Sequence, residues 1–314
     1  MARAFIFPGQ GAQTIGMGKD LADAYPAARA IFDEVDEALG EKLSTLIWEG
    51  DIADLTLTAN AQPALMATSL AAMRALEAEG VSMDAASFVA GHSLGEYSAL
   101  TAAGALTVAD AARLLRKRGQ AMQAAVPVGE GAMAAVLGLD LDAVRKVAAD
   151  AAQGDVCQAA NDNDPAQVVI SGAKAAVERA VDIAKEAGAK RALLLPVSAP
   201  FHCALMQPAA DEMAQALADV TINDPAVPVV ANVVAEAVSD PEQIRKLLVD
   251  QICGAVRWRE SVLWMTGTGE VTEFWEIGAG KALSGMVRRI HKPAAVRNVG
   301  TAADVTAAAQ ALNA

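Results

Sequence analysis

The segment Gly91-His92-Ser93-Leu94-Gly95 has the residue types and spacing of a serine nucleophile. An apolar run ending at Ala90 predicts a buried strand before it, and the Ala- and Leu-rich stretch up to Gly104 predicts a helix after it. Gly-x-Ser-x-Gly between a strand and a helix is typical of a nucleophile elbow. There the glycines let the backbone turn sharply, and Ser93 stands beside helical N–H groups that favour negative charge. The pattern predicts acyl transfer through Ser93; the alternative is a plain strand–turn–helix corner with a capping serine.

A serine hydroxyl needs a general base near neutral pH, and histidine is the usual one. The chain has three histidines. The side chain of His92 should point away from that of Ser93 and pack against the substrate or the sheet, and His291 ends a helix with a basic last turn. His202, in a proline-containing loop before a helix, is therefore the candidate base. No aspartate stands out as a third member, so a backbone carbonyl or an amide side chain is expected to orient this histidine.

Two further segments have local patterns that suggest binding, although each also has a simpler interpretation. The loop Pro8–Gln13 follows the apolar strand Phe5–Phe7, but it lacks the Lys-Ser/Thr of a P-loop and the third glycine of a dinucleotide fingerprint. We interpret it as a loop whose backbone approaches something closely. Thr107 and Asp110 predict a capping box for a helix reaching about Ala125. This helix carries a basic cluster, and such clusters are usually solvated: Arg113, Arg116, Lys117 and Arg118.

The composition limits the class of protein. The chain has 314 residues, is 54% hydrophobic and carries a formal charge of −13, which predicts a globular enzyme with an ample core. No run approaches the roughly 20 apolar residues that span a bilayer, and the N-terminus does not resemble a signal peptide; we expect a cytoplasmic protein with no membrane partner. The negative charge argues against nucleic acid as a partner. Cys157, Cys203 and Cys253 are too far apart for a metal site by local spacing and are expected to be buried.

The pattern of apolar residues over residues 131–197 predicts strands and helices in the order βαββαβ. This is the ferredoxin-like arrangement, and it predicts a compact unit. The loop Asn161–Pro165 inside it is rich in turn formers, so a plain turn is at least as good an interpretation as a binding role. Outside this unit, strands and helices alternate, which predicts a mostly parallel sheet covered on both faces. The predicted strands of the small unit are 132–139, 156–160, 167–171 and 192–197, with helices at 141–152 and 173–187. The other predicted helices are 26–39, 62–79, 241–252, 259–266, 282–290 and one ending near Ala218, with strands at 227–233 and 271–277.

Together these segments resemble the malonyl-CoA:acyl-carrier-protein transacylases of bacterial type II fatty acid synthesis. The resemblance covers nearly the whole chain, and several ordered motifs make it specific. They are Phe5–Gln13, Gly91–Leu100, Arg118-Gly119, Gln167–Gly172, Pro196–His202 and Glu276–Lys281.

The resemblance implies an α/β-hydrolase-like core, residues 1–130 and 198–314, with a ferredoxin-like insertion, residues 131–197. It implies that Ser93 is acylated, that His202 is its base, and that Gln251 orients the histidine. It also implies that Arg118 pairs with the free carboxylate of a malonyl group, a task that suits a bidentate guanidinium. The remaining implied site residues are the backbone N–H groups of Gln10 and Leu94 as oxyanion hole, and His92, Asn161 and Phe201 beside the substrate, with Phe201 resembling the malonyl-selecting form of its loop.

The implied reaction moves a malonyl group from malonyl-CoA to the phosphopantetheine thiol of acyl carrier protein. The resemblance also implies that the enzyme is a monomer and needs no metal or organic prosthetic group. A serine thioesterase or esterase, a malonyl transferase of polyketide synthesis or malonate metabolism, and a non-catalytic acyl-binding subunit remain alternatives. Ala12, Cys253-Gly254-Ala255 and the acidic Asp162 and Asp164 depart from the usual pattern. An acidic carrier needs a basic dock, although ordinary surface charge explains each candidate equally well: Lys185, Lys190, Arg191, Arg288, Arg289 and Lys292.

Overall fold

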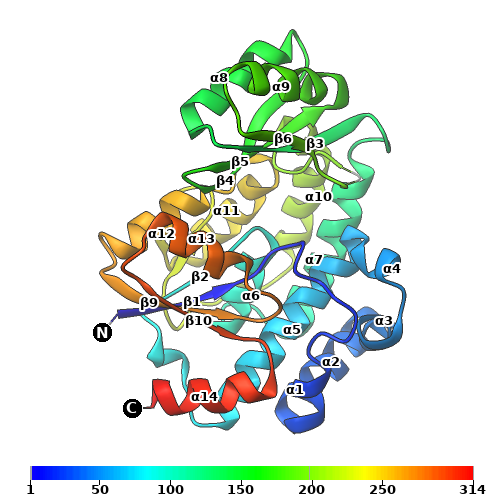
Figure 1. Cartoon of the computed structure of the whole chain (residues 1–314). Coiled ribbons are helices and arrows are strands. Elements are labelled where there is room, and N and C mark those ends of the chain that lie inside the picture. The colour runs from blue at the N-terminus through cyan, green and yellow to red at the C-terminus, as the bar shows by residue number, and fades with distance from the viewer. Residues whose placement is uncertain (1, 198, 314) are drawn as a thin grey trace.

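The computed structural model describes residues 2–197 and 199–313 and contains two sheets of unequal size (Figure 1). Met1, Ser198 and Ala314 lie outside the described residues, and so does the predicted boundary at Ser198. The larger sheet has the strand order β10-β9-β1-β2-β7-β8 and the smaller one β4-β5-β3-β6. The strands of the larger sheet are β1 (Ala2–Phe7), β2 (Phe88–Gly91), β7 (Val229–Ala231), β8 (Glu236–Val238), β9 (Val271–Ile277) and β10 (Ala295–Val299).

The larger sheet is mostly parallel, as predicted, and only β8 runs antiparallel to its neighbour. Its faces are both buried, as alternate side chains of β1 show. Phe5 and Phe7 join the core on one face, and Ala4 and Ile6 join the core on the other. Phe7 pairs with Gly91 at the carboxyl ends of β1 and β2. The loop after β1 and the corner after β2 therefore emerge side by side, which is where parallel sheets carry their ligand sites.

Helices cover both faces of this sheet. Helix α5 is buried along most of its length and begins at Thr58, four residues before the predicted start. Pro63 lies inside it and lacks the N–H that would bond the carbonyl of Ala59; Arg116 Nη1 donates to that carbonyl instead, at 2.7 Å. The helices are α1 (Lys19–Ala24), α2 (Pro26–Leu39), α3 (Leu43–Glu49), α4 (Ile52–Thr56), α5 (Thr58–Ala78), α6 (Leu94–Ala102), α7 (Val108–Ala124), α10 (Gln207–Ala218), α11 (Pro241–Cys253), α12 (Trp258–Thr266), α13 (Ala282–Ile290) and α14 (Ala302–Leu312), with short 3₁₀ turns at Met83–Ala85 and Ala204–Met206.

The smaller sheet is antiparallel and lies with α8 and α9 at the top of Figure 1. Its strands and helices follow one another in the predicted order, and their apolar side chains form a core separate from that of the larger sheet. The elements are β3 (Gly131–Leu137), α8 (Leu141–Ala152), β4 (Cys157–Asp164), β5 (Gln167–Ala173), α9 (Lys174–Glu186) and β6 (Arg191–Leu194).

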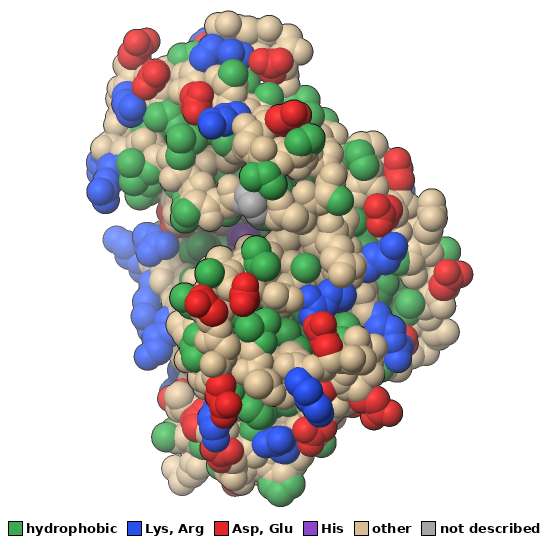
Figure 2. Space-filling view, turned by 90° about the vertical axis from the view of Figure 1, so that its right-hand side faces the viewer, with side chains coloured by type: hydrophobic (Ala, Val, Ile, Leu, Met, Phe, Trp, Pro, Cys, Tyr) green, Lys and Arg blue, Asp and Glu red, His purple; other side chains and the backbone are tan. Residues whose placement is uncertain are grey.

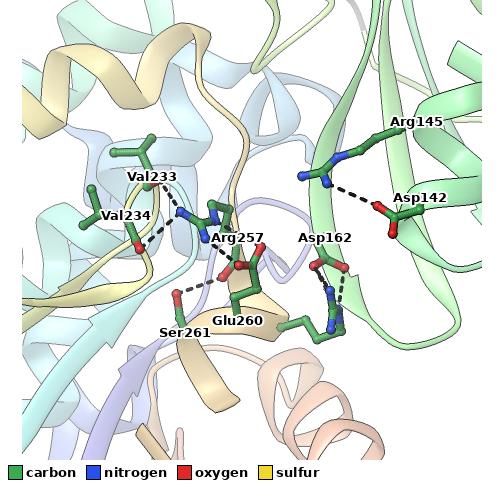
Figure 3. A network of polar contacts seen from close by, with 9 residues as sticks. Asp142, Arg145, Asp162, Val233, Val234, Arg257, Glu260 and Ser261 are labelled. Carbon is green, nitrogen blue, oxygen red and sulfur yellow. Dashed lines mark hydrogen bonds and ion pairs between the residues drawn. The ribbon is translucent and has the colours of Figure 1, made fainter. Parts of the chain in front are cut away.

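The turn predicted over residues 161–165 is wrong for its first four residues, because Asn161–Asp164 forms the second half of β4; the turn itself lies at Pro165 and Ala166. Asp162 accepts hydrogen bonds from Arg259 Nε at 3.0 and 2.9 Å, and Figure 3 shows its carboxylate facing that guanidinium. Asp164 pairs with Arg289 at 2.7 Å, and Asn163 bonds His92. Three consecutive side chains are thus bound by tertiary partners, which override the local preference of Asn and Asp for turns.

Other differences concern the ends of elements and the short elements. Strands β6 and β7 are shorter than predicted, and several elements were not predicted: α1, α3, α4, α14, β8 and β10. The predicted capping box of α7 is one-sided, because Thr107 Oγ1 accepts the Asp110 N–H but donates its proton to the Asp110 carboxylate. Cys157 and Cys203 are buried, whereas Cys253 is half-buried, contrary to expectation. Among the described residues, no helix is long and apolar enough to cross a membrane.

Candidate active site

The corner between β2 and α6 holds Ser93 in a strained backbone conformation, with φ at +53°. The flanking glycines allow neighbouring backbone segments to approach closely. They are not needed for the turn itself, because the residue with positive φ is the serine. A Cβ on Gly91 would lie 1.9 Å from the carbonyl of Gly95, and one on Gly95 would lie 2.3 Å from Phe7 O. The Gly-x-Ser-x-Gly spacing is therefore required because α6 packs directly against the ends of β1 and β2.

Ser93 and His202 are in direct contact. Ser93 Oγ lies 2.8 Å from His202 Nε2, and His202 Nδ1 lies 2.9 Å from the backbone carbonyl of Gln251. A carbonyl only accepts, so Nδ1 carries the proton and Nε2 is the acceptor for the serine hydroxyl. Burial, followed by the charge of Arg118, lowers the pKa of His202 to about 3, so the imidazole is neutral and able to take a proton at neutral pH.

Arg118 is the member of the basic cluster that faces this pair. Its side chain is 1% exposed, and its Nη atoms donate to Gln62 Oε1 at 2.7 Å, Gln251 Oε1 at 2.8 Å and Ser93 Oγ at 3.0 Å. All three acceptors are uncharged, and burial lowers the pKa of this guanidinium. A buried cation held by neutral groups beside the nucleophile is suited to receive a carboxylate.

The other three members of the cluster lie toward the surface. Arg113 pairs with Asp110, and Lys117 pairs with Glu212 at 3.2 Å. Arg116 is half-buried; besides Ala59, it contacts Glu41. The usual solvated interpretation of a charge run therefore holds for Arg113 and Lys117, and Arg118 is the exception.

Gln10 and Leu94, whose backbone N–H groups are expected to form an oxyanion hole, both line the cavity that also holds Ser93. Leu94 begins α6, where the first helical N–H groups have no intrahelical acceptor. Gln10 belongs to the loop after β1 and lines the same cavity. This loop does approach closely, as predicted, because a Cβ on Gly9 would lie 2.7 Å from the carbonyl of His92. Thr58 donates to Gln10 Oε1 at 2.8 Å and so restrains the Gln10 side chain.

A cavity of about 400 Å³ opens over Ser93 between the two sheets. Figure 2 shows the hollow and, within it, a histidine side chain. His92, Asn161 and Phe201, expected beside the substrate, all line this cavity. The ring of His92 lies against that of Trp258, with centroids 5.9 Å apart, and its Nε2 lies 2.9 Å from Asn163 Oδ1. The apolar part of the wall comes mainly from the smaller sheet and α13: Met133, Ala135, Val169, Leu195, Leu283 and Met286.

Comparison with known proteins agrees with this geometry. The acyl transferase domain model matches residues 4–300. The malonyl CoA-acyl carrier protein transacylase of Bacillus subtilis is 51% identical over 290 residues, covering 92% of this chain and 90% of the relative. The crystal structure of the acyl-carrier-protein S-malonyltransferase of Bartonella henselae has a TM-score of 0.97 at 56% identity, and all of both chains is covered. The chain belongs to the malonyl-CoA:acyl-carrier-protein transacylase family.

A further structure widens the comparison within this family. It holds a type II PKS acyl-carrier protein in complex with its malonyl-transacylase, which has a TM-score of 0.96 and 43% identity, with 99% of this chain and 100% of that chain covered. In this chain, the side chains of His202 and Arg118 both contact Ser93 Oγ. The relatives with which it shares its family are named for malonyl transfer.

Gln251, expected to orient the histidine, contacts it through the backbone and not through the side chain. Its backbone carbonyl contacts His202, while its side chain accepts from Arg118 and donates to Ser93 O at 3.2 Å. Of the two expected kinds of orienting group, the structure has the backbone carbonyl. His291 is the residue that follows α13, as predicted for a histidine at a helix end.

Sequence reasoning missed three polar residues beneath the site. Asn232 follows β7 and accepts the Ser93 N–H at 2.8 Å, while its Nδ2 donates to Gly91 O at 2.7 Å. Glu96 is buried in α6, and Gln62 in α5 holds Arg118. Asn232 lies near the carboxyl end of the predicted strand 227–233, and that position was the available signal, because carboxyl ends of parallel strands meet at one edge. Glu96 and Gln62 had no local signal beyond a polar residue in an apolar helix.

Proposed function

We propose that this protein transfers the malonyl group of malonyl-CoA to the phosphopantetheine thiol of acyl carrier protein through a malonyl-serine intermediate, for fatty acid synthesis. The observation that carries the proposal is the position of Ser93 Oγ, 2.8 Å from His202 Nε2 and 3.0 Å from Arg118 Nη2. One group accepts the serine proton, and the other binds the carboxylate that distinguishes malonyl from acetyl.

The reaction runs in two matching halves. His202 takes the Ser93 proton as Oγ attacks the thioester carbonyl, and the oxyanion is held by the N–H groups of Gln10 and Leu94. Expulsion of the coenzyme A thiolate, protonated by His202, leaves the malonyl-serine ester. The carrier thiol then gives its proton to His202 and attacks this ester, and His202 returns the proton to Ser93. Asn161 and Phe201 line the space for the acyl chain.

The test is intact-mass analysis of the protein mixed with malonyl-CoA, followed by holo-carrier protein. We expect a malonyl adduct on the wild type and none on Ser93→Ala, and we expect the carrier to discharge the adduct. Rapid discharge to water with none reaching the carrier would establish the thioesterase or esterase alternative. Absence of both an adduct and turnover would establish an acyl-binding subunit.

A malonyl transferase serving polyketide synthesis is the second candidate. The relative bound to a type II PKS acyl-carrier protein supports it. A malonyl transferase of malonate metabolism shares the same chemistry. Discharge of the malonyl-enzyme onto a fatty-acid carrier and onto a polyketide carrier, compared by their kcat/KM values, separates these pathways.

We infer that residues 1–130 and 198–314 form an α/β-hydrolase-like catalytic subdomain and that residues 131–197 form a ferredoxin-like one. The separate antiparallel sheet and apolar core of the small unit support this division. We also infer a cytoplasmic monomer that needs no metal or organic prosthetic group. The proposed chemistry supports the last point, because proton transfer and acyl exchange at a serine use side chains alone.

A basic dock for the acidic carrier is proposed at the two sides of the cavity mouth. Lys185 and Arg289 are paired with Asp182 and Asp164. Among the described residues, the other candidates form no ion pair. Lys190 precedes β6 and Arg191 begins it, and residues 195–197 after this strand line the cavity. Arg288 lies in the last turn of α13 and Lys292 two residues beyond its end, and Leu283 and Met286 of this helix line the cavity.

The double variant Lys190→Glu/Arg191→Glu is expected to raise KM for holo-carrier about tenfold at low salt and to leave acylation by malonyl-CoA within twofold, since exposed charges steer encounter more than chemistry. Arg145→Glu/Lys146→Glu, on α8 of the same unit and outside the cavity lining, makes the same total charge change and is the matched control. Stopped-flow discharge at two salt concentrations measures the effect. An unchanged KM for the carrier contradicts the dock.

A further inference from the structure

Glu96 is a buried carboxylate that the proposed reaction does not use. It lies in α6, three residues after the nucleophile, and is 2% exposed. Its Oε2 accepts the backbone N–H of Asn232 at 2.8 Å and the side-chain Nε2 of Gln251 at 3.1 Å. Burial of a carboxylate is costly unless hydrogen bonds and an opposite charge compensate it.

The two groups that Glu96 accepts from position the reacting atoms from opposite sides. Asn232 holds the elbow, because its amide bonds both the N–H of Ser93 and the carbonyl of Gly91. Gln251 holds the base through its backbone carbonyl and the guanidinium of Arg118 through Oε1. One oxygen of Glu96 therefore links Asn232, which holds the nucleophile, to Gln251, which holds both the base and Arg118.

The charges around Glu96 are few. Arg118 on α7 is the cation nearby. Burial raises the pKa of Glu96 to about 7, against the lowering effects of the hydrogen bonds from Asn232 and Gln251 and of the Arg118 charge. Tyr97 on the same helix is neutral, since burial raises its pKa to about 12. His202 across Gln251 is neutral as well. In the free protein above pH 7, ionised Glu96 therefore compensates the charge of the buried Arg118.

A substrate carboxylate on Arg118 would replace Glu96 in this role and leave the site with two negative charges and one positive charge. Burial of an uncompensated charge is costly, and protonation of the buried group removes the cost. We propose that Glu96 is a positioning residue that takes up a proton when an acyl group bearing a carboxylate occupies the site beside Arg118. The inference rests on the proposed function, which places that carboxylate there.

Binding to the Ser93→Ala variant, which cannot be acylated, tests the proton uptake by calorimetry in buffers of different ionisation enthalpy. We expect malonyl-CoA to bind with proton uptake and to weaken as pH rises from 7 to 9, by up to about tenfold per pH unit. Acetyl-CoA shares every phosphate but lacks the carboxylate, and it should bind without this uptake. In Ser93→Ala/Glu96→Gln, the uptake and the pH dependence of malonyl-CoA binding should both disappear.

Two results would overturn the inference while leaving the proposed function standing: malonyl-CoA binding without proton uptake, or the same uptake in the Glu96→Gln background. Failure of malonyl-CoA to bind or to acylate the wild type would instead reject the proposed function.

The positioning role has its own readout. Glu96→Ala should lower the acylation rate at pH 7 about 100-fold relative to the wild type. Glu96→Gln still accepts both N–H groups, so its rate should be only about tenfold below that of the wild type. Equal losses in the two variants, at matched thermal stability, would contradict it.

Discussion

Replacing Arg118 with alanine should lower kcat/KM for malonyl-CoA by about 10²–10³-fold, while acylation by acetyl-CoA should change by less than tenfold. The guanidinium is 1% exposed and held by neutral acceptors, so an arriving carboxylate gains a charge-assisted, water-excluded contact. Loss of one partner of a buried charge pair costs about 3–5 kcal/mol. Stopped-flow or quenched-flow acylation with the two acyl donors measures the difference.

Arg118→Lys is the matched control for this prediction. It keeps the charge but loses the planar fork that reaches Gln62, Ser93 and Gln251 together, so malonyl transfer should fall between wild type and alanine variant. Thermal unfolding of each variant checks that the buried network still folds. An equal loss for malonyl and acetyl donors would show that Arg118 serves Ser93 itself and does not select the acyl group.

Replacing His202 with alanine should slow acylation of Ser93 by about 10²–10⁴-fold with either donor, the range that a positioned general base contributes. His202→Gln is a matched control that keeps much of the side-chain volume while losing the base, and it should fall equally. Binding of malonyl-CoA should change little, because the loss is in the rate of proton transfer. A His202→Ala variant that acylates at the wild-type rate would contradict the role.

The pH profile of acylation distinguishes this histidine from an ordinary one. Because the pKa of His202 is lowered to about 3, the base stays neutral across neutral pH, and no inflection near pH 6.5 should come from it. An inflection near pH 7 that Glu96→Gln removes belongs to Glu96, whereas one that persists in that variant contradicts the lowered pKa of His202. His202 also makes the stability of the fold depend on pH. Between pH 6.5 and about 3 the unfolded chain binds a proton on His202 and the folded chain does not, so the free energy of unfolding decreases as the pH falls through this range.

Arg118 illustrates the limit of local patterns. Four basic residues in six positions look alike in the sequence, and only the resemblance to a family singled out one of them. The structure supplies the physical reason, because α7 packs against α5 and turns that one side chain toward Gln62, Ser93 and Gln251. Whether a charge is solvated or buried depends on the neighbouring helix, which periodicity along one segment does not reveal.

The sequence by itself singled out Ser93 and His202, which the structure brings into contact, and most of the long elements. Gly-x-Ser-x-Gly has a local cause, since a side chain on Gly91 or Gly95 would collide with the backbone of the adjoining elements, and His202 followed by elimination among three histidines. The tertiary structure alone decided the strand at Asn161–Asp164, the orienting carbonyl of Gln251 and the buried network of Glu96 and Asn232. These depend on partners 49 to 158 positions away in the chain. Long-range hydrogen bonds and ion pairs supply energies that local turn and helix preferences do not contain.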